Sequence, residues 1–174
     1  MRQTLRLHPD SLCATANRIE ADIARPHPGG LILSFVVNGR ITDLRWPPVV
    51  TPARADELWR HTCFEAFVRP STGPAYYEFN FSPSTRWAAY RFDSYRGGMR
   101  VATEIAAPRI EVRSDEATFT LQAALELDGL SSPLHLGLSA VLEETNDRKS
   151  YWALAHPPGK ADFHHADCFA LELS

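Results

Sequence analysis

The strongest constraint on the fold is an alternation of apolar and polar residues, with a period of two, in residues 57–95. Proline, glycine and serine divide this segment into three runs, of which the first two cover residues 61–69 and 76–82. Alternation between such turn signals is typical of strands with one buried face. We therefore predict an antiparallel meander of three strands. Its predicted inner face carries Phe64, Tyr77, Phe79 and Phe81.

The register of the first two strands follows from their side chains, because directly opposed residues of an antiparallel pair lie on the same face. If the loop at residues 70–75 joins them directly, Phe64 lies opposite Phe81 and Glu65 opposite Asn80. Apolar residues then meet apolar residues at every step. A slip of one residue would move every side chain to the other face, so this agreement favours the register.

The third strand is expected to follow a two-residue turn at residues 83–84. That turn puts Trp87 opposite Asn80 and Arg91 opposite Tyr76. The predicted outer face of the meander is therefore rich in hydrogen-bonding and aromatic side chains, namely His61, Glu65, Tyr76, Glu78, Asn80, Trp87 and Arg91.

Short alternating runs also occur along the rest of the chain, and about ten strands are expected in total. Thr51 followed by Pro52 has the pattern of a helix start and predicts the only helical turns. Strands of this number and spacing predict an all-β fold, an antiparallel β-sandwich of the immunoglobulin-like or jelly-roll-like kind with very little helix. No repeat or change of composition divides the chain, so residues 1–174 are expected to form a single domain.

Three segments carry a resemblance to a known family. They read LWRHTCFEAFV, YYEFNFSPSTRWAAYRF and SYWALAHPPGKADFHHADCF, and they lie in the second third of the chain and its last quarter. They resemble the bacterial DOMON-like domains, which are relatives of the family 9 carbohydrate-binding modules. The resemblance implies a β-sandwich that binds a ligand, with sugar or haem as the ligands known across the wider superfamily.

Composition and charge are those of an ordinary globular protein, with 44% hydrophobic and 22% charged residues. A net charge of −3 gives no general attraction to nucleic acid or to an anionic membrane. Neither a signal peptide nor a membrane-spanning segment is recognisable, so we expect a cytoplasmic location. The oligomeric state stays open.

Cys13, Cys63 and Cys168 are odd in number and widely spaced, which indicates reduced thiols. Small buried side chains are the simplest interpretation. Cys63 shares its predicted face with His61, which leaves a catalytic Cys/His pair open.

Two carboxylates and three tryptophans are the main candidates for ligand contacts. Glu65 and Glu78 lie on neighbouring predicted strands and the same face, where they could bind a ligand, form surface ion pairs or act as acid and base. Trp59, Trp87 and Trp152 could stack on a sugar or belong to the core.

A Pro/Gly-rich loop at residues 156–165 adds His156, His164 and His165. Loops on a rigid sheet often carry binding residues. The histidine spacing matches no standard zinc motif, so no metal is expected. Haem would need axial donors such as His or Met, and Met99 is the only methionine besides Met1; we expect no cofactor.

These patterns favour a small-ligand-binding module over an enzyme, since no nucleophile, base and orienting group are visible together. The expected ligand is carbohydrate-like. The alternatives are an enzyme that uses Glu65 and Glu78 as acid and base, and a haem-binding redox domain. The predicted ligand-binding residues are Trp59, His61, Glu65, Glu78, Asn80, Trp87, Arg91, Trp152, His156 and His164.

Overall fold

The computed structural model describes residues 1–130 and 133–173 and shows an all-β fold. The described residues contain twelve strands, three short 3-10 helices and no α-helix, and therefore no helix that could cross a membrane. The strands are β1 (Arg2–Leu7), β2 (Ala16–Ala24), β3 (Gly30–Gly39), β4 (Cys63–Pro70), β5 (Tyr76–Phe81), β6 (Trp87–Phe92), β7 (Arg100–Val101), β8 (Arg109–Ser114), β9 (Thr118–Glu126), β10 (Leu134–Glu143), β11 (Lys149–Ala153) and β12 (Leu171–Leu173). The 3-10 helices are η1 (Ile41–Asp43), η2 (Leu58–Arg60) and η3 (Ala166–Cys168).

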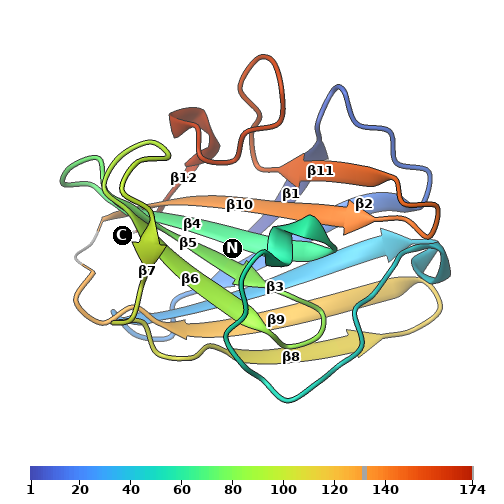
Figure 1. Ribbon diagram of the computed structural model, residues 1–174, viewed down its shortest axis with the longest axis horizontal. Helices are drawn as coiled ribbons and strands as arrows, with labels where there is room; N and C mark the ends of the chain where they lie inside the picture. Colours follow the sequence, from blue (N-terminus) through green and yellow to red (C-terminus); the bar gives the residue numbers. More distant parts are fainter. Residues whose placement is uncertain (131–132, 174) are drawn as a thin grey trace.

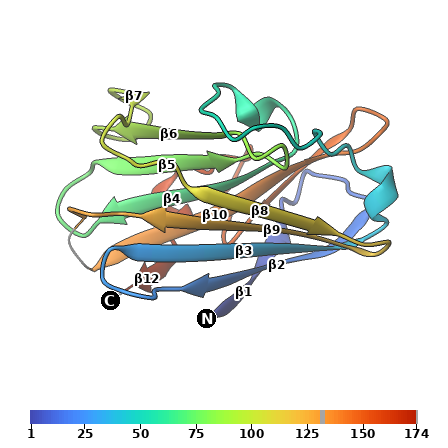
Figure 2. The ribbon, with the colours of Figure 1, turned by 90° about the horizontal axis from the view of Figure 1, so that it is seen from below.

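The strands form one antiparallel sheet that curls until its two halves face each other (Figures 1 and 2). Layer A has the order β8-β9-β3-β2-β1, and layer B has the order β7-β6-β5-β4-β10-β11. Strand β1 belongs to both layers, because Arg2–Leu5 pairs with β2 while Arg6 and Leu7 pair with β11. β12 pairs with β10 beside the end of layer B. The predicted all-β antiparallel fold is confirmed.

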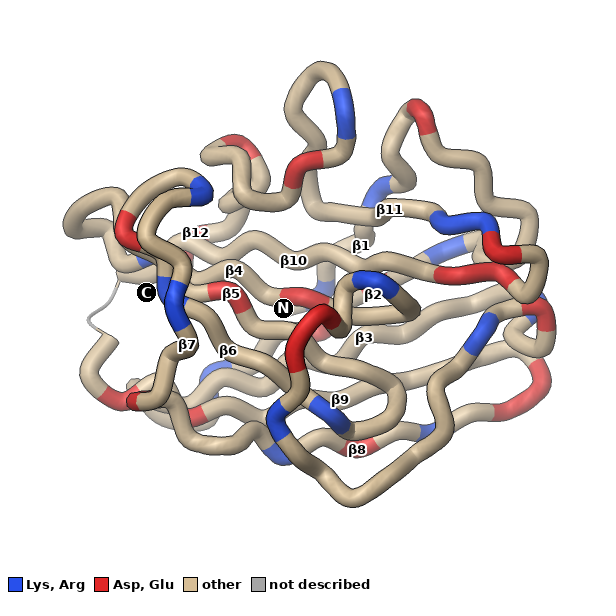
Figure 3. Tube along the Cα trace, in the orientation of Figure 1, with Lys and Arg blue, Asp and Glu red and all other residues tan. Residues whose placement is uncertain are grey.

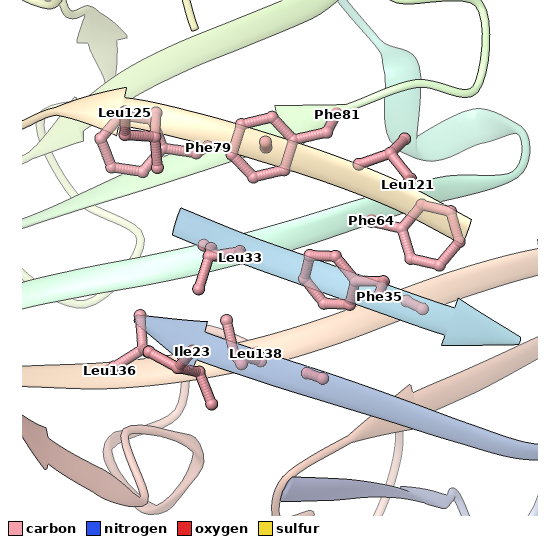
Figure 4. Packing of buried hydrophobic residues seen from close by; sticks show 14 of the residues in the cluster. Ile23, Leu33, Phe35, Phe64, Phe79, Phe81, Leu121, Leu125, Leu136 and Leu138 are labelled. Carbon is pink, nitrogen blue, oxygen red and sulfur yellow. The ribbon is translucent and has the colours of Figure 1, made fainter. Parts of the chain in front are cut away.

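The core lies between the two layers (Figure 4). Phe35 of β3 meets Phe64 of β4 with 5.0 Å between ring centroids, so the layers contact each other directly. The leucines of β10 are buried in the same cluster. Phe79 and Phe81 are fully buried there, which confirms the inner-face assignment.

The predicted register between β4 and β5 is confirmed. Phe64 lies opposite Phe81 and Glu65 lies opposite Asn80. The outer face of layer B therefore carries the carboxylates, as expected from the alternation.

The predicted register between β5 and β6 is wrong by one residue. Trp87 lies opposite Phe81, and Ala88 takes the place expected for Trp87 opposite Asn80. The connection has three residues instead of two, because the Ser82 N–H donates to the Arg86 carbonyl at 2.9 Å. Thr85 completes this loop with a φ of 71°. Glycine and asparagine favour this conformation, so a threonine at this position gives no sign of it in the sequence.

This shift exchanges the two faces of β6. Trp87 points into the core and is 6% exposed, and Arg91 lies on the inner parity opposite Tyr77. Tyr90 and Phe92 point outwards instead, opposite Glu78 and Tyr76 respectively.

The helix predicted to begin at Thr51 does not form, and only η2 is helical in that segment. Arg54 instead bridges to Trp87 in parallel fashion, and its guanidinium donates to the carbonyls of Ala89 (2.9 Å) and Ala102 (3.0 Å). These bonds anchor an extended segment along the edge of layer B. Tertiary contacts outweigh the weak local preference of a capping sequence.

Candidate functional site

A cleft of about 370 Å³ opens on the outer face of layer B, and we call it the carboxyl cleft. Its floor comes from β4, β5 and β10, while η2 and the loop between β11 and η3 rise around it (Figure 1). The lining residues are Trp59, Glu65, Glu78, Phe92, Arg96, Met99, Val141, Tyr151, Ala161, Phe163 and His164. The loop at residues 156–165 contributes Ala161, Phe163 and His164 to this lining.

Two buried carboxyls form the floor of the cleft. Glu65 is 3% exposed and accepts a hydrogen bond from the Ser139 hydroxyl at 3.0 Å. Glu78 is 5% exposed and accepts one from the Asn80 amide at 2.7 Å. Burial, and then the nearby Glu78 carboxyl, raise the pKa of Glu65 to about 8. Burial also raises the pKa of Glu78. Glu65 is therefore mostly protonated at neutral pH and can both donate and accept hydrogen bonds.

Cys63 and Asn80 extend this buried polar row. The Cys63 thiol lies 3.6 Å from the Asn80 side-chain oxygen, and neither residue is exposed. Burial, together with the carboxyls of Glu65 and Glu78, raises the pKa of Cys63 well above its ordinary value. The nucleophilic form of cysteine is the thiolate, so the structure gives no support to a catalytic Cys63.

His164 connects the floor to the loop above it. The Tyr76 hydroxyl lies 2.8 Å from His164 Nδ1 and accepts a hydrogen bond from the Arg96 N–H at 3.2 Å. His164 Nε2 lies 3.6 Å from a Glu78 oxygen. Burial, and then the Arg96 charge, lower the pKa of His164 to about 4. The contact with Glu78 is therefore not an ion pair near neutral pH.

The loop is held in place by an ion pair and a tyrosine. Arg96 contacts Asp162 at 2.8 Å, and the Tyr95 hydroxyl donates to the same carboxylate. The Asp162 side chain also accepts from the His164 N–H at 3.1 Å, which fixes the turn that presents the imidazole.

Aromatic rings form two sides of the cleft. Trp59 of η2 is 36% exposed and meets Tyr90 edge to face at 6.0 Å. The Tyr90 hydroxyl in turn donates to Asp56 at 2.6 Å, which ties the segment before η2 to β6. Tyr151 of β11 and Phe163 of the loop lie 6.2 Å apart.

Four of the predicted ligand-binding residues line the cleft: Trp59, Glu65, Glu78 and His164. Asn80 is completely buried and acts on the site only through Glu78. His61 does not line the cleft but pairs with Glu143, with 2.8 Å between Nδ1 and Oε2.

The other four predicted site residues lie elsewhere. Trp87 is a core residue with the Arg54 guanidinium 4.3 Å from its ring, and Arg91 lies 3.8 Å from Glu104 near the edge strand. Trp152 is 5% exposed in the core, because Tyr151 takes the outward position on β11. His156 lies outside the cleft, where its Nε2–H donates to the Arg6 carbonyl oxygen at 2.8 Å.

Sequence reasoning missed Tyr151, Phe163 and Arg96. The alternation of β11 could have predicted the position of Tyr151. Neighbouring residues of a strand point to opposite faces, so Tyr151 must point outwards once Trp152 points inwards. No periodicity exists in the loops that carry Phe163 and Arg96, so their positions depend on tertiary contacts alone.

Haem fits this cleft poorly, although Met99 and His164 both line it. Both imidazole nitrogens of His164 already face partners, and the floor consists of two carboxyls where a porphyrin needs apolar contacts. Within the described ranges no three His, Cys, Asp or Glu side chains are grouped as a metal site.

Comparison with known proteins gives matches at the level of the fold. No family model and no curated protein matches the chain. A protein from Bacteroides uniformis, provisionally assigned as carbohydrate-binding, matches 97% of this chain and 83% of its own, with a TM-score of 0.67 at 13% identity. A family 9 carbohydrate-binding module from Caldicellulosiruptor kristjanssonii in complex with cellotriose matches over 91% and 74% of the two chains, with a TM-score of 0.54 at 11% identity. The fold resembles that of family 9 carbohydrate-binding modules.

A glucose complex of a family 9 module from the same organism matches over 86% of this chain and 72% of its own. Its TM-score is 0.50 at 11% identity. At these identities the likeness concerns the fold, and the DOMON-like assignment stays a prediction.

Proposed function

We propose that this chain is a binding module for a carbohydrate-like ligand, and that the ligand lies in the carboxyl cleft. The observation that carries the proposal is the combination of aromatic walls with a floor of buried carboxyls. The rings of Trp59, Tyr151 and Phe163 offer flat apolar surfaces on which the C–H face of a sugar can stack. A protonated Glu65 both donates and accepts, which matches the hydrogen bonding of a hydroxyl.

Two further points support a sugar as the ligand. The fold resembles modules whose solved complexes contain cellotriose and glucose. The resemblance of the sequence motifs to DOMON-like domains implies sugar or haem as the ligand, and sugar is therefore one of the two classes of ligand that it supports.

The geometry favours binding over catalysis by Glu65 and Glu78. Burial raises the pKa of both carboxyls, which favours their uncharged, hydrogen-bonding form. Ser139 donates to one oxygen of Glu65 and Asn80 to one oxygen of Glu78, which holds both carboxyls in place as parts of a binding surface.

The proposal is tested by titrating the protein with glucose and with cellotriose, using calorimetry and tryptophan fluorescence. Trp59 is the most exposed of the four tryptophans, so ligand stacking should change the emission. Trp59→Ala should weaken binding at least about tenfold, since a buried aromatic contact contributes roughly 1–3 kcal/mol.

The matched control is Val49→Ala, which truncates an apolar side chain that is 63% exposed and outside the cleft. It should leave the affinity unchanged. Binding that survives Trp59→Ala unaltered would place the ligand elsewhere, and no binding of any sugar in a broad panel would reject the proposed function.

A further inference from the structure

A second cleft, of about 560 Å³, lies next to the carboxyl cleft. Tyr151 and Ala161 line both clefts, so these two residues form the boundary between them. A ligand longer than one sugar ring could therefore extend from one cleft into the other past Tyr151.

The second cleft is basic, and we call it the basic cleft. Arg148, Lys149 and Lys160 line it against a single acid, Asp10. Figure 3 shows the basic positions at the start of β11 and on the loop that follows it. Lys149 and Lys160 are the only lysines in the chain, and both lie here.

The two lysines are available for a ligand. Within residues 1–130 and 133–173, neither forms an ion pair with a carboxylate, and Lys149 donates only to the Arg60 carbonyl. Arg148 lies near Glu144 and helps to lower the pKa of that carboxyl. The positive charge of the cleft is therefore only partly balanced by the protein.

A buried histidine borders the basic cleft. His8 is 3% exposed, and its Nδ1 accepts a hydrogen bond from the Asp10 N–H at 3.1 Å, so the ring proton of the neutral form is on Nε2. Nε2 is itself buried and has no hydrogen-bond partner among the described residues, and the His8 ring meets the His156 ring edge to face at 4.9 Å. The capacity of the cleft to bind an anion therefore comes from Lys149 and Lys160.

From this juxtaposition we infer that the ligand is an acidic saccharide, with neutral rings in the carboxyl cleft and a carboxylate or phosphate group in the basic cleft. The inference rests on the proposed function and adds the charge of the ligand to it. Glu65 adds little negative charge beside an anion, because it is mostly protonated at neutral pH.

The first test compares ligands that differ only in one charged group. Cellotriose is titrated beside cellotrioses that carry a carboxylate or a phosphate at C6 of either terminal ring. We expect at least one acidic form to bind about tenfold more tightly than cellotriose at low salt, which is the effect of one or two partly exposed charge contacts. This ratio should fall towards one in 0.5 M salt because screening weakens such contacts.

The double variant Lys149→Gln and Lys160→Gln should lower the ratio to near one. The matched control is Arg109→Gln with Arg113→Gln, which removes two exposed charges from β8 in layer A. The control should keep the preference for the acidic form, and the melting temperatures of both variants should stay near that of the unmodified protein.

Lysine labelling provides a second readout that does not depend on affinity. Reductive methylation can modify only Lys149, Lys160 and the amino terminus, and mass spectrometry separates the three sites. The acidic trisaccharide should protect both lysines, whereas the amino terminus, which donates to the Ile23 carbonyl, should react equally with and without ligand.

The outcomes separate the inference from the function on which it rests. Equal affinity for neutral and acidic trisaccharides, with both lysines unprotected, would overturn the inference and leave the sugar-binding function standing. Absence of binding to every saccharide would overturn both.

Discussion

Glu65 and Glu78 lie on neighbouring strands of layer B, and the Glu78 carboxyl adds to burial in raising the pKa of Glu65 to about 8. The pair is buried, with hydrogen bonds from Ser139 to Glu65 and from Asn80 to Glu78. A carboxyl is compatible with burial when protonation removes its charge, and burial raises the pKa of both carboxyls in that direction.

The first prediction concerns pH. The pKa of Glu65 is higher in the folded state than its ordinary value of 4.5, so the folded protein holds a proton that the unfolded chain has lost. Stability should fall as pH rises from about 5 to about 8, with a slope of at most about 1.4 kcal/mol per pH unit for this group. Glu65→Gln should flatten that dependence in urea unfolding at pH 5 and pH 8. The exposed control Glu111→Gln on β8 should not, and equal slopes for both variants would contradict the assignment.

The second prediction concerns the core between the layers. Phe79 is completely buried on the inner face of β5. Phe79→Ala should lower the free energy of unfolding by roughly 3–5 kcal/mol, because it removes a large side chain and leaves a cavity. Val49→Ala, at an exposed position, should change it by less than about 0.5 kcal/mol. A loss below about 1 kcal/mol for the Phe79 variant would contradict the register.

The third prediction concerns Asn80, which is fully buried and bonded to Glu78. Asn80→Ala should cost about 1–3 kcal/mol, because it leaves a buried Glu78 oxygen without its donor. Asn80→Asp at pH 8 should cost more, since it places another carboxylate among buried carboxyls. Urea unfolding measures both, and a neutral Asn80→Ala would indicate that solvent reaches this position.

The fourth prediction concerns the protonation of His164. Its pKa is lowered to about 4, first by burial and then by Arg96. Nuclear magnetic resonance of the ring nitrogens should therefore show a neutral imidazole at pH 5.5. Arg96→Gln should raise the titration midpoint because it removes a nearby positive charge, and the distant Arg113→Gln should leave it in place. A charged ring at pH 5.5 in the unmodified protein would be the contrary result.

The part of the fold that sequence predicts well is the part with strict alternation. Only one of the two possible alternations of β4 and β5 buries their phenylalanines. The sequence therefore predicts that Glu65 lies opposite Asn80, as it does in the structure. The same reasoning placed the two floor carboxyls on one face. It depends only on the identity of the residues along each strand.

Prediction failed where backbone geometry decides the outcome. The turn before β6 depends on Thr85 adopting a positive φ, which no glycine or asparagine signals, and the resulting shift moved Trp87 into the core. Tryptophans were favoured as site residues for their chemistry, yet Trp152 is inside and Tyr151 is at the cleft. The chemical type of a side chain is therefore a weaker guide to the direction in which it points than its position in the alternation of the strand.

The double membership of β1 also has a consequence for the order in which the molecule can assemble during synthesis. Arg2–Leu5 can pair with β2 early, whereas Arg6 and Leu7 have their partners at Trp152 and Ala153 and can be paired only after most of the chain has been synthesised. The loop that supplies Phe163 and His164 to the carboxyl cleft is synthesised later still. All the strands of layer A are therefore made before the last residues that line the cleft.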